Sequence, residues 1–240
     1  MNSIYRNLGS CLASRCLHCR RSLWTDSALC VVCGHRWEAS RVPDSDLPMT
    51  INGAPLVVES VFSDQSPVRS LLHAFKYEGR LDLADALASP LARRIRPHAG
   101  PDAVVIPVPS HRLRVLERGY CQAAVLAGRV AAHLGCAARP DVLARRAHAG
   151  SQTRLPAPER KRNVSQAFVA TGTGETGHRS TGAGTVILID DVITTGATLA
   201  ACARVLYEAG WASTGDASRA MLLAAVAIRP PLPECGHIDA

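Results

Sequence analysis

The sequence contains no apolar run that approaches the roughly 18 residues needed by a membrane-spanning helix. Its first residues, from Met1 to Cys11, also lack the continuous apolar stretch of a secretory signal peptide. We therefore expect a protein that does not insert into a membrane and that stays in the cytoplasm.

Aromatic residues are scarce, at 4% of the chain. This scarcity argues against an aromatic stacking platform for single-stranded nucleic acid, although contacts to backbone phosphates need no aromatic side chain.

A second absence concerns nucleotide binding. The chain holds no G-x-x-x-x-G-K-[ST] loop, so Asp190 and Asp191 do not qualify as the Walker B carboxylates of a P-loop protein.

The overall composition is that of a folded protein. Of the 240 residues, 47% are hydrophobic and 20% are charged. Such a chain can bury the core of one α/β domain and carry a small appendage. The net charge of +7 suits anionic partners such as phosphorylated metabolites or nucleic acid.

Five of the nine cysteines fall in the first 33 residues. Two pairs, Cys16-x-x-Cys19 and Cys30-x-x-Cys33, have the spacing of metal-binding knuckles and together offer four thiolates to one tetrahedral Zn²⁺. Disulfides or unused thiols are the alternative, but clustered pairs in a reducing compartment favour metal. We expect residues 1–45 to form a zinc-binding unit that depends on the metal for its folding energy, and residues 46–240 to form the main domain.

Apolar runs alternate with helical patterns through the rest of the chain. Candidate strands lie at 55–62, 104–109, 186–189 and 220–228. Helical patterns cover 67–95, with an interruption at 76–79, and also 123–134 and 197–208. Unbroken apolar strands that alternate with helices predict a mainly parallel, Rossmann-like sheet covered on both faces.

Two polar segments are expected to be loops. The basic segment 145–163 has the length and charge of a lid that closes over a reactive site, and a nucleic-acid-binding arm would look the same. Its cations are Arg145, Arg146, Arg154, Arg160, Lys161 and Arg162. The Gly- and Thr-rich segment 171–185 contains a literal G-x-G-x-x-G match at 172–177. We do not interpret it as a dinucleotide site, because no helical pattern follows it.

The strongest motif begins at the strand 186–189. Asp190 and Asp191 follow the strand directly, and ligands of open parallel sheets bind beyond the carboxyl ends of the strands. Carboxylates at that position can accept hydrogen bonds from ribose hydroxyls or help to hold a hydrated Mg²⁺. The next helix starts with small residues whose backbone N–H groups suit a phosphate, namely Thr194, Thr195, Gly196, Ala197 and Thr198. The alternative is an ordinary turn in which threonine caps the helix.

Cations are expected at the same edge of the sheet. His111, Arg112, Arg114 and Arg118 follow the strand 104–109, where positive charge would stabilise a departing pyrophosphate. A solvated basic loop is the alternative interpretation. Lys76 is a further cation that either reaches the phosphates or ends a helix in solvent.

Segment 186–198 resembles the ribose-phosphate-binding signature of type I phosphoribosyltransferases. The wider chain resembles the ComF family, which is associated with competence and DNA uptake in bacteria. That resemblance rests on 72–80, on 106–109 followed by 118–123, and on a set of single residues: Gln152, Arg160, Asn163 and Phe168. The family usually has Asn at the position of Cys121.

The resemblance implies a type I phosphoribosyltransferase-like domain with a small N-terminal zinc unit. It also implies binding of phosphoribosyl pyrophosphate, or another ribose phosphate, together with Mg²⁺. By this resemblance, Asp190, Asp191 and Arg118 are the catalytic candidates, and Gly119, Lys76 and residues 194–198 bind the ligand.

Two kinds of function follow from these expectations. One is a role in DNA uptake, with single-stranded DNA and a competence helicase as partners, with or without phosphoribosyl transfer to an acceptor. The other is a metabolic phosphoribosyltransferase, a glycosyl-transfer enzyme of nucleotide salvage or synthesis without a DNA role. The acceptor cannot be identified from the sequence.

Overall fold

The computed structural model describes residues 14–25, 27–43, 49–51, 54–100, 102–146, 167–171, 184–212 and 221–228. Several predicted features lie outside these residues: Gln152, Arg160, Asn163, the glycine motif at 172–177 and most of the basic segment 145–163. No helix among the described residues is long and apolar enough to cross a membrane.

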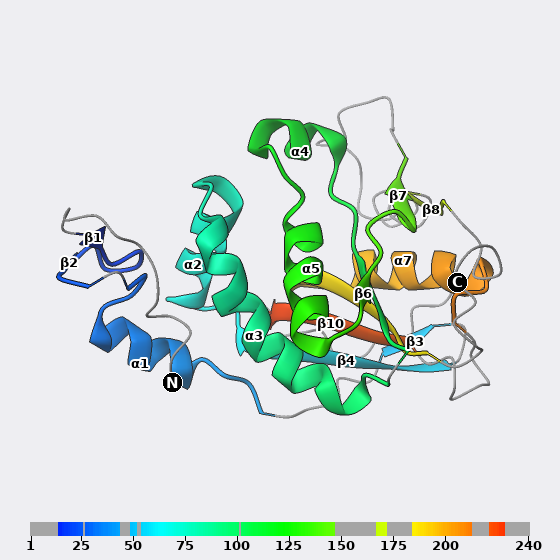
Figure 1. Ribbon diagram of the computed structural model, residues 1–240, viewed down its shortest axis with the longest axis horizontal. Coiled ribbons are helices and arrows are strands. Elements are labelled where there is room, and N and C mark those ends of the chain that lie inside the picture. Colours follow the sequence, from blue (N-terminus) through cyan, green and yellow to red (C-terminus); the bar gives the residue numbers. More distant parts are fainter. Residues whose placement is uncertain are drawn as a thin grey trace.

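The main structure is a six-stranded sheet in the order β3-β4-β10-β9-β5-β6 (Figure 1). Its strands are β3 (Met49–Ile51), β4 (Ala54–Ser63), β5 (Val104–Pro107), β6 (Ala137–Ala138), β9 (Val186–Ile193) and β10 (Met221–Ile228). All neighbouring strands are parallel except β3, which pairs antiparallel with β4 at one edge. Strand β9 therefore lies inside the sheet, with β10 and β5 beside it.

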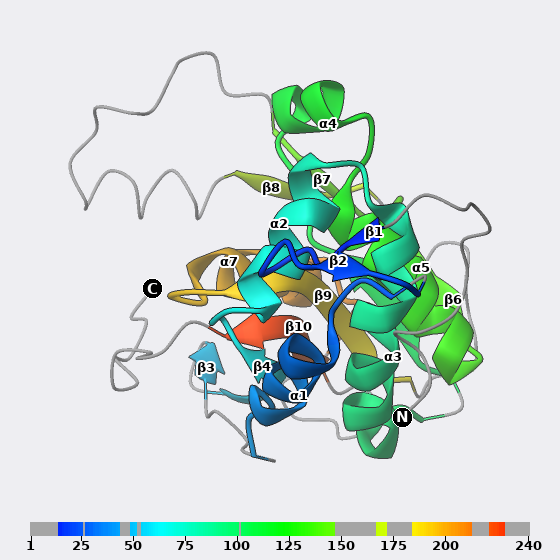
Figure 2. The ribbon, with the colours of Figure 1, turned by 90° about the vertical axis from the view of Figure 1, so that its left-hand side faces the viewer.

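Helices cover both faces of this sheet. Helices α2 (Val68–Tyr77), α3 (Ala84–Ile95) and α5 (Gln122–Leu134) pack on one face, and α7 (Ala197–Glu208) packs on the other (Figure 2). Side chains alternate along β9, so Ile187 and Ile189 join the first core while Val186 and Leu188 join the second. The predicted parallel α/β sheet with helices on both faces is confirmed.

The cysteine-rich segment forms a small unit at one end of the molecule. It consists of a hairpin of β1 (Ser14–Arg15) and β2 (Ser22–Leu23), followed by α1 (Val31–Ala39). The Trp37 and Phe62 rings, on α1 and β4, lie 4.1 Å apart between centroids. Because Leu23, Leu29 and Trp37 belong to the same buried cluster as α2 and α3, the unit packs directly on the main sheet domain. The boundary at residue 45 remains a prediction.

Some elements differ from the sequence expectation. The segment after β5 that carries His111, Arg112, Arg114 and Arg118 is not a loop but contains α4 (Arg112–Arg118). The His111 side chain caps its first turn, and Gly119 ends it in the left-handed region at φ 82°. The predicted 67–95 helix is divided by Gly79 (φ 65°) and a short 3₁₀ turn, η1 (Leu81–Leu83), while a second such turn, η2 (Arg96–His98), follows α3.

Two short strands, one at the start of the basic segment 145–163 and one after it, form a separate hairpin. Strand β7 (Leu143–Arg145) pairs antiparallel with β8 (Phe168–Ala170), so that Arg145 is opposite Phe168. The hairpin packs towards α7, since Leu143 and Phe168 belong to the same buried cluster as Leu199 and Leu206. It therefore places Arg145, the first residue of the basic segment 145–163, on the α7 side of the sheet.

Candidate functional site

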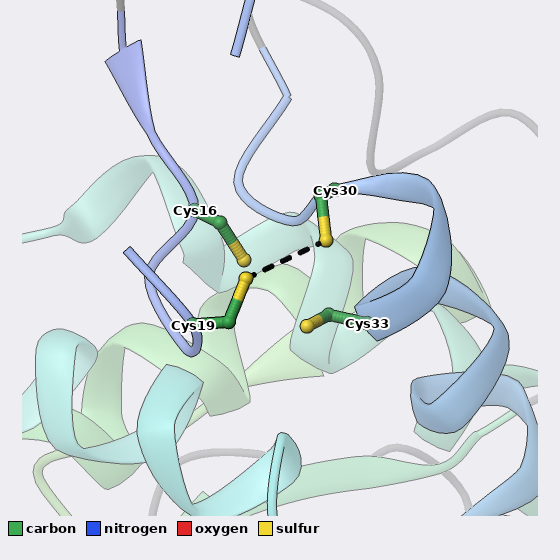
Figure 3. Close-up of side chains that lie close together, drawn as sticks. All are labelled: Cys16, Cys19, Cys30 and Cys33. Carbon is green, nitrogen blue, oxygen red and sulfur yellow. Dashed lines mark hydrogen bonds between the residues drawn. The ribbon is translucent and has the colours of Figure 1, made fainter. Parts of the chain in front are cut away.

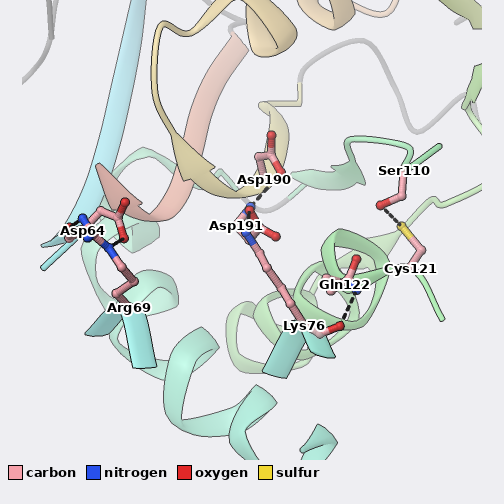
Figure 4. Close-up of polar contacts among 8 residues, drawn as sticks. All are labelled: Asp64, Arg69, Lys76, Ser110, Cys121, Gln122, Asp190 and Asp191. Carbon is pink, nitrogen blue, oxygen red and sulfur yellow. Dashed lines mark hydrogen bonds and ion pairs between the residues drawn. The ribbon is translucent and has the colours of Figure 1, made fainter. Parts of the chain in front are cut away.

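The two aspartates lie in the last residues of β9, at the carboxyl edge of the sheet (Figure 4). Strand β9 is longer than predicted, because its pairing with β10 continues through Asp190 as far as Ile193. The Asp190 carboxylate accepts a hydrogen bond from the Asp191 backbone N–H at 2.8 Å. Both side chains are half-buried, so they remain within reach of a ligand at this edge.

Lys76 reaches this edge from the last turn of α2. Its Nζ lies 2.9 Å from Oδ1 of Asp191, and both side chains are partly buried (Figure 4). The structure therefore brings together two of the predicted site elements, a cation on α2 and the carboxylates on β9. The α2 residue is not a solvated helix end.

The pKa of Asp190 is unusually high for a carboxylic acid. Burial and the adjacent charge of Asp191 raise its pKa to about 7, although the Asp191 N–H, Lys76 and Arg145 act in the opposite direction. Burial and the charge of Asp190 in turn raise the pKa of the Cys202 thiol on α7. The carboxyl group of Asp190 therefore gains or loses its proton near neutral pH.

The turn between β9 and α7 is accessible in part, since Thr194 and Thr195 are exposed while Gly196 is buried. Gly196 has φ 72°, a left-handed conformation that glycine adopts without strain. Thr195 Oγ1 accepts a hydrogen bond from the Ala197 N–H at 3.4 Å. The first backbone hydrogen bond of α7 runs from the Ala200 N–H to the Gly196 carbonyl at 2.9 Å. The N–H groups of Thr198 and Leu199 precede it and have no carbonyl four residues back within the helix, so they are donors available to an anion next to the aspartates. Ala197 and Thr198 are half-buried there.

Arg118, the last residue of α4 before Gly119, lies against the end of α2. The Arg118 guanidinium is 4.4 Å from the ring centroid of Tyr77. Two further contacts bind this segment to α2, because the Tyr120 hydroxyl donates to the Phe75 carbonyl and Gln122 Nε2 donates to the Lys76 carbonyl at 3.4 Å. Arg118 therefore packs on an aromatic ring next to Lys76 rather than against the aspartates.

Cys121 is the N-cap residue of α5 and makes no capping hydrogen bond with its side chain. Its thiol lies 3.4 Å from Ser110 Oγ and 4.0 Å from the Val108 carbonyl (Figure 4). These contacts connect the start of α5 to the segment that leaves β5. The residue thus lines the same edge of the sheet as the two aspartates without touching them.

Arg145 is a residue that sequence reasoning grouped with a loop and did not assign to the site. Burial and the charge of Arg114 lower its pKa, while Cys202 and Asp190 act to raise it. Its guanidinium also lies 5.2 Å from the centroid of the Phe168 ring. Arg145 thus adds positive charge near Asp190. The signal in the sequence was its place two residues after the apolar pair Val142-Leu143.

The four cysteines form one cluster (Figure 3). Their Sγ atoms all lie within 4.8 Å of one another, and those of Cys19 and Cys30 are 3.7 Å apart. Four thiolates about 2.3 Å from one Zn²⁺ would be about 3.8 Å from each other, so the cluster fits a tetrahedral zinc ion. Arg20, with φ 62°, makes the tight turn after Cys19. This arrangement supports the predicted zinc site at Cys16, Cys19, Cys30 and Cys33.

The thiol pKa values differ within the cluster: that of Cys16 is lowered, which favours the metal-binding thiolate, whereas that of Cys33 is raised. Burial raises the pKa of Cys16, but the backbone amides of Cys19, Cys30 and His18 outweigh it and lower the pKa to about 6. Burial and the neighbouring thiols raise the pKa of Cys33 to about 12. A bound cation would favour the thiolate form of every ligand. The cluster is anchored to α2, since His18 Nδ1 lies 3.0 Å from Ser70 Oγ.

The fold and site define a class: an open parallel α/β sheet with acids and a donor-rich helix start at one edge, and a four-cysteine cluster beside it. No family model matches the chain. Among curated proteins, the DNA utilization protein YhgH of Escherichia coli K12 is 30% identical over 205 residues, which cover 82% of this chain and 86% of that protein. Competence protein F of Haemophilus influenzae is 28% identical over 216 residues, covering 82% and 92%. The chain belongs to this ComF family of competence and DNA-utilization proteins.

Solved structures of phosphoribosyltransferases are also similar. The purine phosphoribosyltransferase of Pyrococcus horikoshii Ot3 is 18% identical with a TM-score of 0.38, covering 62% of this chain and 76% of that one. The adenine phosphoribosyltransferase of Leishmania tarentolae is 14% identical with a TM-score of 0.38, covering 75% and 96%.

Proposed function

We propose that the chain binds a 5-phosphoribosyl group, most specifically that of phosphoribosyl pyrophosphate, at the carboxyl edge of β9. The observation that carries this proposal is the adjacency of Asp190 and Asp191 to the exposed turn that starts α7. On this proposal the acids accept hydrogen bonds from the ribose hydroxyls. The N–H groups and hydroxyls of residues 194–198 bind the 5-phosphate.

The pyrophosphate would lie towards the cationic side of the site. Lys76 is already at this edge, and Arg118, which ends α4 directly before Gly119, packs on the ring of Tyr77, the residue after Lys76 in α2. Carboxylate oxygens are suitable ligands for Mg²⁺, so Asp190 and Asp191 fit a hydrated ion carried by the ligand. Bound Mg²⁺ would neutralise the charge that develops on pyrophosphate.

Phosphoribosyl transfer is the reaction that such a site would favour. The bond between the anomeric carbon and pyrophosphate breaks, pyrophosphate leaves with the electron pair, and an acceptor forms the new bond. The protein would contribute by holding the sugar and by balancing charge, without a covalent nucleophile of its own. A metabolic phosphoribosyltransferase without a DNA role is the alternative.

A role in DNA uptake is the second component of the proposal. It is supported by the names of the relatives and by the surface of the cysteine unit, where Trp24 is 92% exposed and Arg20 and Arg21, four and three residues earlier in the chain, are exposed as well. An exposed indole is suited to stack on a base of single-stranded DNA, and exposed cations are suited to contact its phosphates. We propose single-stranded DNA, and a competence helicase that handles it, as partners.

Thermal unfolding tests the ligand site. Phosphoribosyl pyrophosphate with Mg²⁺, at about 100 times its Kd, is expected to stabilise the protein by about 2.7 kcal/mol. The double variant Thr194→Val/Thr198→Val should show a smaller shift, because two donors are lost. The control is Thr185→Val, at the other end of β9, where the hydroxyl donates to the His98 carbonyl. Equal shifts in all three proteins would argue against the phosphate assignment.

Separate assays distinguish transfer from DNA binding. Sustained pyrophosphate release with a nucleobase or amine acceptor would support the enzyme.

DNA binding is tested by fluorescence anisotropy with a labelled single strand, and its affinity should fall steeply as salt increases. Trp24→Phe should retain most of that affinity, whereas Trp24→Ser should lose it. If both variants bind like wild type, Trp24 is not part of a DNA surface.

A further inference from the structure

Helix α4 projects from the domain and has no buried side chain. Both ribbon views show it beyond the end of the sheet, apart from the helices that cover the two faces (Figure 1 and Figure 2). A helix of seven residues is marginal in water unless a packed face stabilises it. The contacts that order α4 are at its ends, namely the His111 cap, the left-handed Gly119 and the packing of Arg118 on Tyr77.

Two leucines make one side of this helix apolar. Leu113 is 61% exposed and Leu116 is 69% exposed. Residues three apart lie on the same side of a helix, so the two side chains form one patch. Neither leucine belongs to the buried clusters on the two faces of the sheet or packs against them. Packing of the core therefore does not explain why α4 carries large apolar side chains.

The surroundings of the leucine pair are positively charged. Helix α4 has three arginines and one acid, Glu117. Arg112 and Arg114 are both exposed, and Arg112 lies one helical turn before Leu116, so its guanidinium is a neighbour of the apolar patch. The chain as a whole carries a net charge of +7, which opposes the approach of a second copy to this surface. The complementary surface is therefore one that is both apolar and acidic.

We propose that α4 is a docking site for an acidic segment of a partner protein. The leucine pair receives apolar side chains of that segment, and the arginines pair with its carboxylates. Apolar burial supplies affinity, and the complementary charges supply orientation and a fast association rate. This surface is separate from the proposed sugar-phosphate site and does not depend on it.

Two other anionic partners match the surface less well. Nucleic acid would use the arginines through its phosphates, but this binding gains nothing from exposed leucines. A lipid surface could accept the leucines, but the strength of interfacial binding follows the apolar area that is buried, and two side chains offer little. The combination of a small apolar patch with flanking arginines favours a peptide.

A phage-displayed library of random peptides, selected on immobilised full-length protein, tests the docking site. The enriched peptides are expected to be acidic and to contain Leu, Ile or Phe. A labelled synthetic copy of one of them should bind Leu113→Ser/Leu116→Ser at least about tenfold more weakly in fluorescence anisotropy. Arg112→Glu should also weaken binding, and so should added salt.

The matched control is Val31→Ser/Val32→Ser, a second pair of exposed apolar residues, at the start of α1. These valines are 68% and 51% exposed, and the variant should bind the peptide like wild type. Because none of the substituted residues is buried, a melting temperature close to that of wild type is expected for each variant.

The remaining outcomes refute the docking site. They include a selection without enrichment, enriched peptides that are not acidic, and an acidic peptide that binds wild type and the leucine variant equally. Leucine-dependent binding to phosphatidylglycerol vesicles would assign the patch to a lipid surface, and a leucine-dependent dimer in sedimentation would assign it to a second copy. Retained peptide binding with a lost affinity for ribose 5-phosphate in the leucine variant would make α4 part of the sugar-phosphate site instead.

Discussion

At the scale of single residues, the candidate site depends on the protonation state of Asp190. Its pKa, raised to about 7 by burial and by Asp191, means that the acid exists in both forms near neutral pH. In the unfolded chain it would ionise near 3.8. Between these values the folded state holds a proton that the unfolded state has released. Asp190 therefore contributes stability that is lost as the pH rises through about 7.

Ligand binding should show the opposite pH dependence. Ribose hydroxyls and Mg²⁺ both prefer the ionised carboxylate, so the affinity for ribose 5-phosphate with Mg²⁺ is expected to rise about tenfold between pH 6 and pH 8. The charged groups that surround this carboxyl group are Asp191, Lys76 and Arg145. Titration calorimetry at several pH values measures the effect. Asp190→Asn should bind weakly and give a flat profile, and a tenfold rise in that variant would assign the pH dependence to another group.

Cys121 offers a prediction about stability. It occupies the N-cap of α5 in an extended conformation without a capping hydrogen bond, a position where Asn is among the best residues. Cys121→Asn should raise the free energy of unfolding by about 1 kcal/mol. Urea denaturation measures this change, with Cys121→Ala as the control that removes the thiol contact without adding a cap. An Asn variant no more stable than the Ala variant would mean that the first turn of α5 does not accept the cap.

At the scale of elements, the start of α7 depends on a left-handed residue. Gly196→Ala places a Cβ at φ 72° and should destabilise the fold by about 1 kcal/mol, while also weakening phosphate binding. The matched control is Gly128→Ala in the exposed middle of α5, where an added Cβ meets nothing within 4 Å. That substitution should stabilise by about 0.5 kcal/mol. Chemical denaturation of both variants checks the opposite signs, and equal signs would contradict this account of the turn.

The cysteine unit yields a prediction about metal. Purified protein should contain about one zinc ion per chain, and a strong chelator should lower the melting temperature, since structural zinc contributes its binding energy to folding. Cys33→Ser should lose both the zinc and the chelator effect. Cys136→Ser, outside the cluster, should keep both. Zinc measured by elemental analysis decides the matter: metal-free wild type with an unchanged melting temperature would contradict a structural zinc site.

The regular elements could be predicted from sequence because their signals are local. Strand β10 and the ends of α5 and α7 agree with the apolar periodicity and the terminal glycines. Helix α4 could not be recognised, since its caps depend on His111 and on a left-handed Gly119. The extension of β9 through Asp190 and Asp191 was also hidden, because Asp is a poor strand former and only pairing with β10 keeps it extended.

At the scale of the whole molecule, α2 connects the cysteine unit, the edge of the sheet at β9 and the end of α4. Ser70 contacts the cysteine unit through His18, and Lys76 contacts Asp191 at the sheet edge. Tyr77 meets Arg118 at the end of α4. Each contact joins residues far apart in sequence, which is why residue types and spacing predicted the members of the site but not these partners. The roles of all the predicted site residues at this edge remain predictions, namely Lys76, Arg118, Gly119, Asp190, Asp191 and residues 194–198.

Calorimetric titration with phosphoribosyl pyrophosphate and Mg²⁺ at pH 8 tests the central claim most directly. Wild type should bind with measurable heat, and so should Asp85→Asn, whose carboxylate pairs with His133 instead of belonging to the β9 edge. The double variant Asp190→Asn/Asp191→Asn should bind at least about a hundredfold more weakly, since two hydrogen bonds to charged acceptors are weakened together. Equal heats and affinities in all three proteins would contradict the assignment of the sugar-phosphate site to the end of β9.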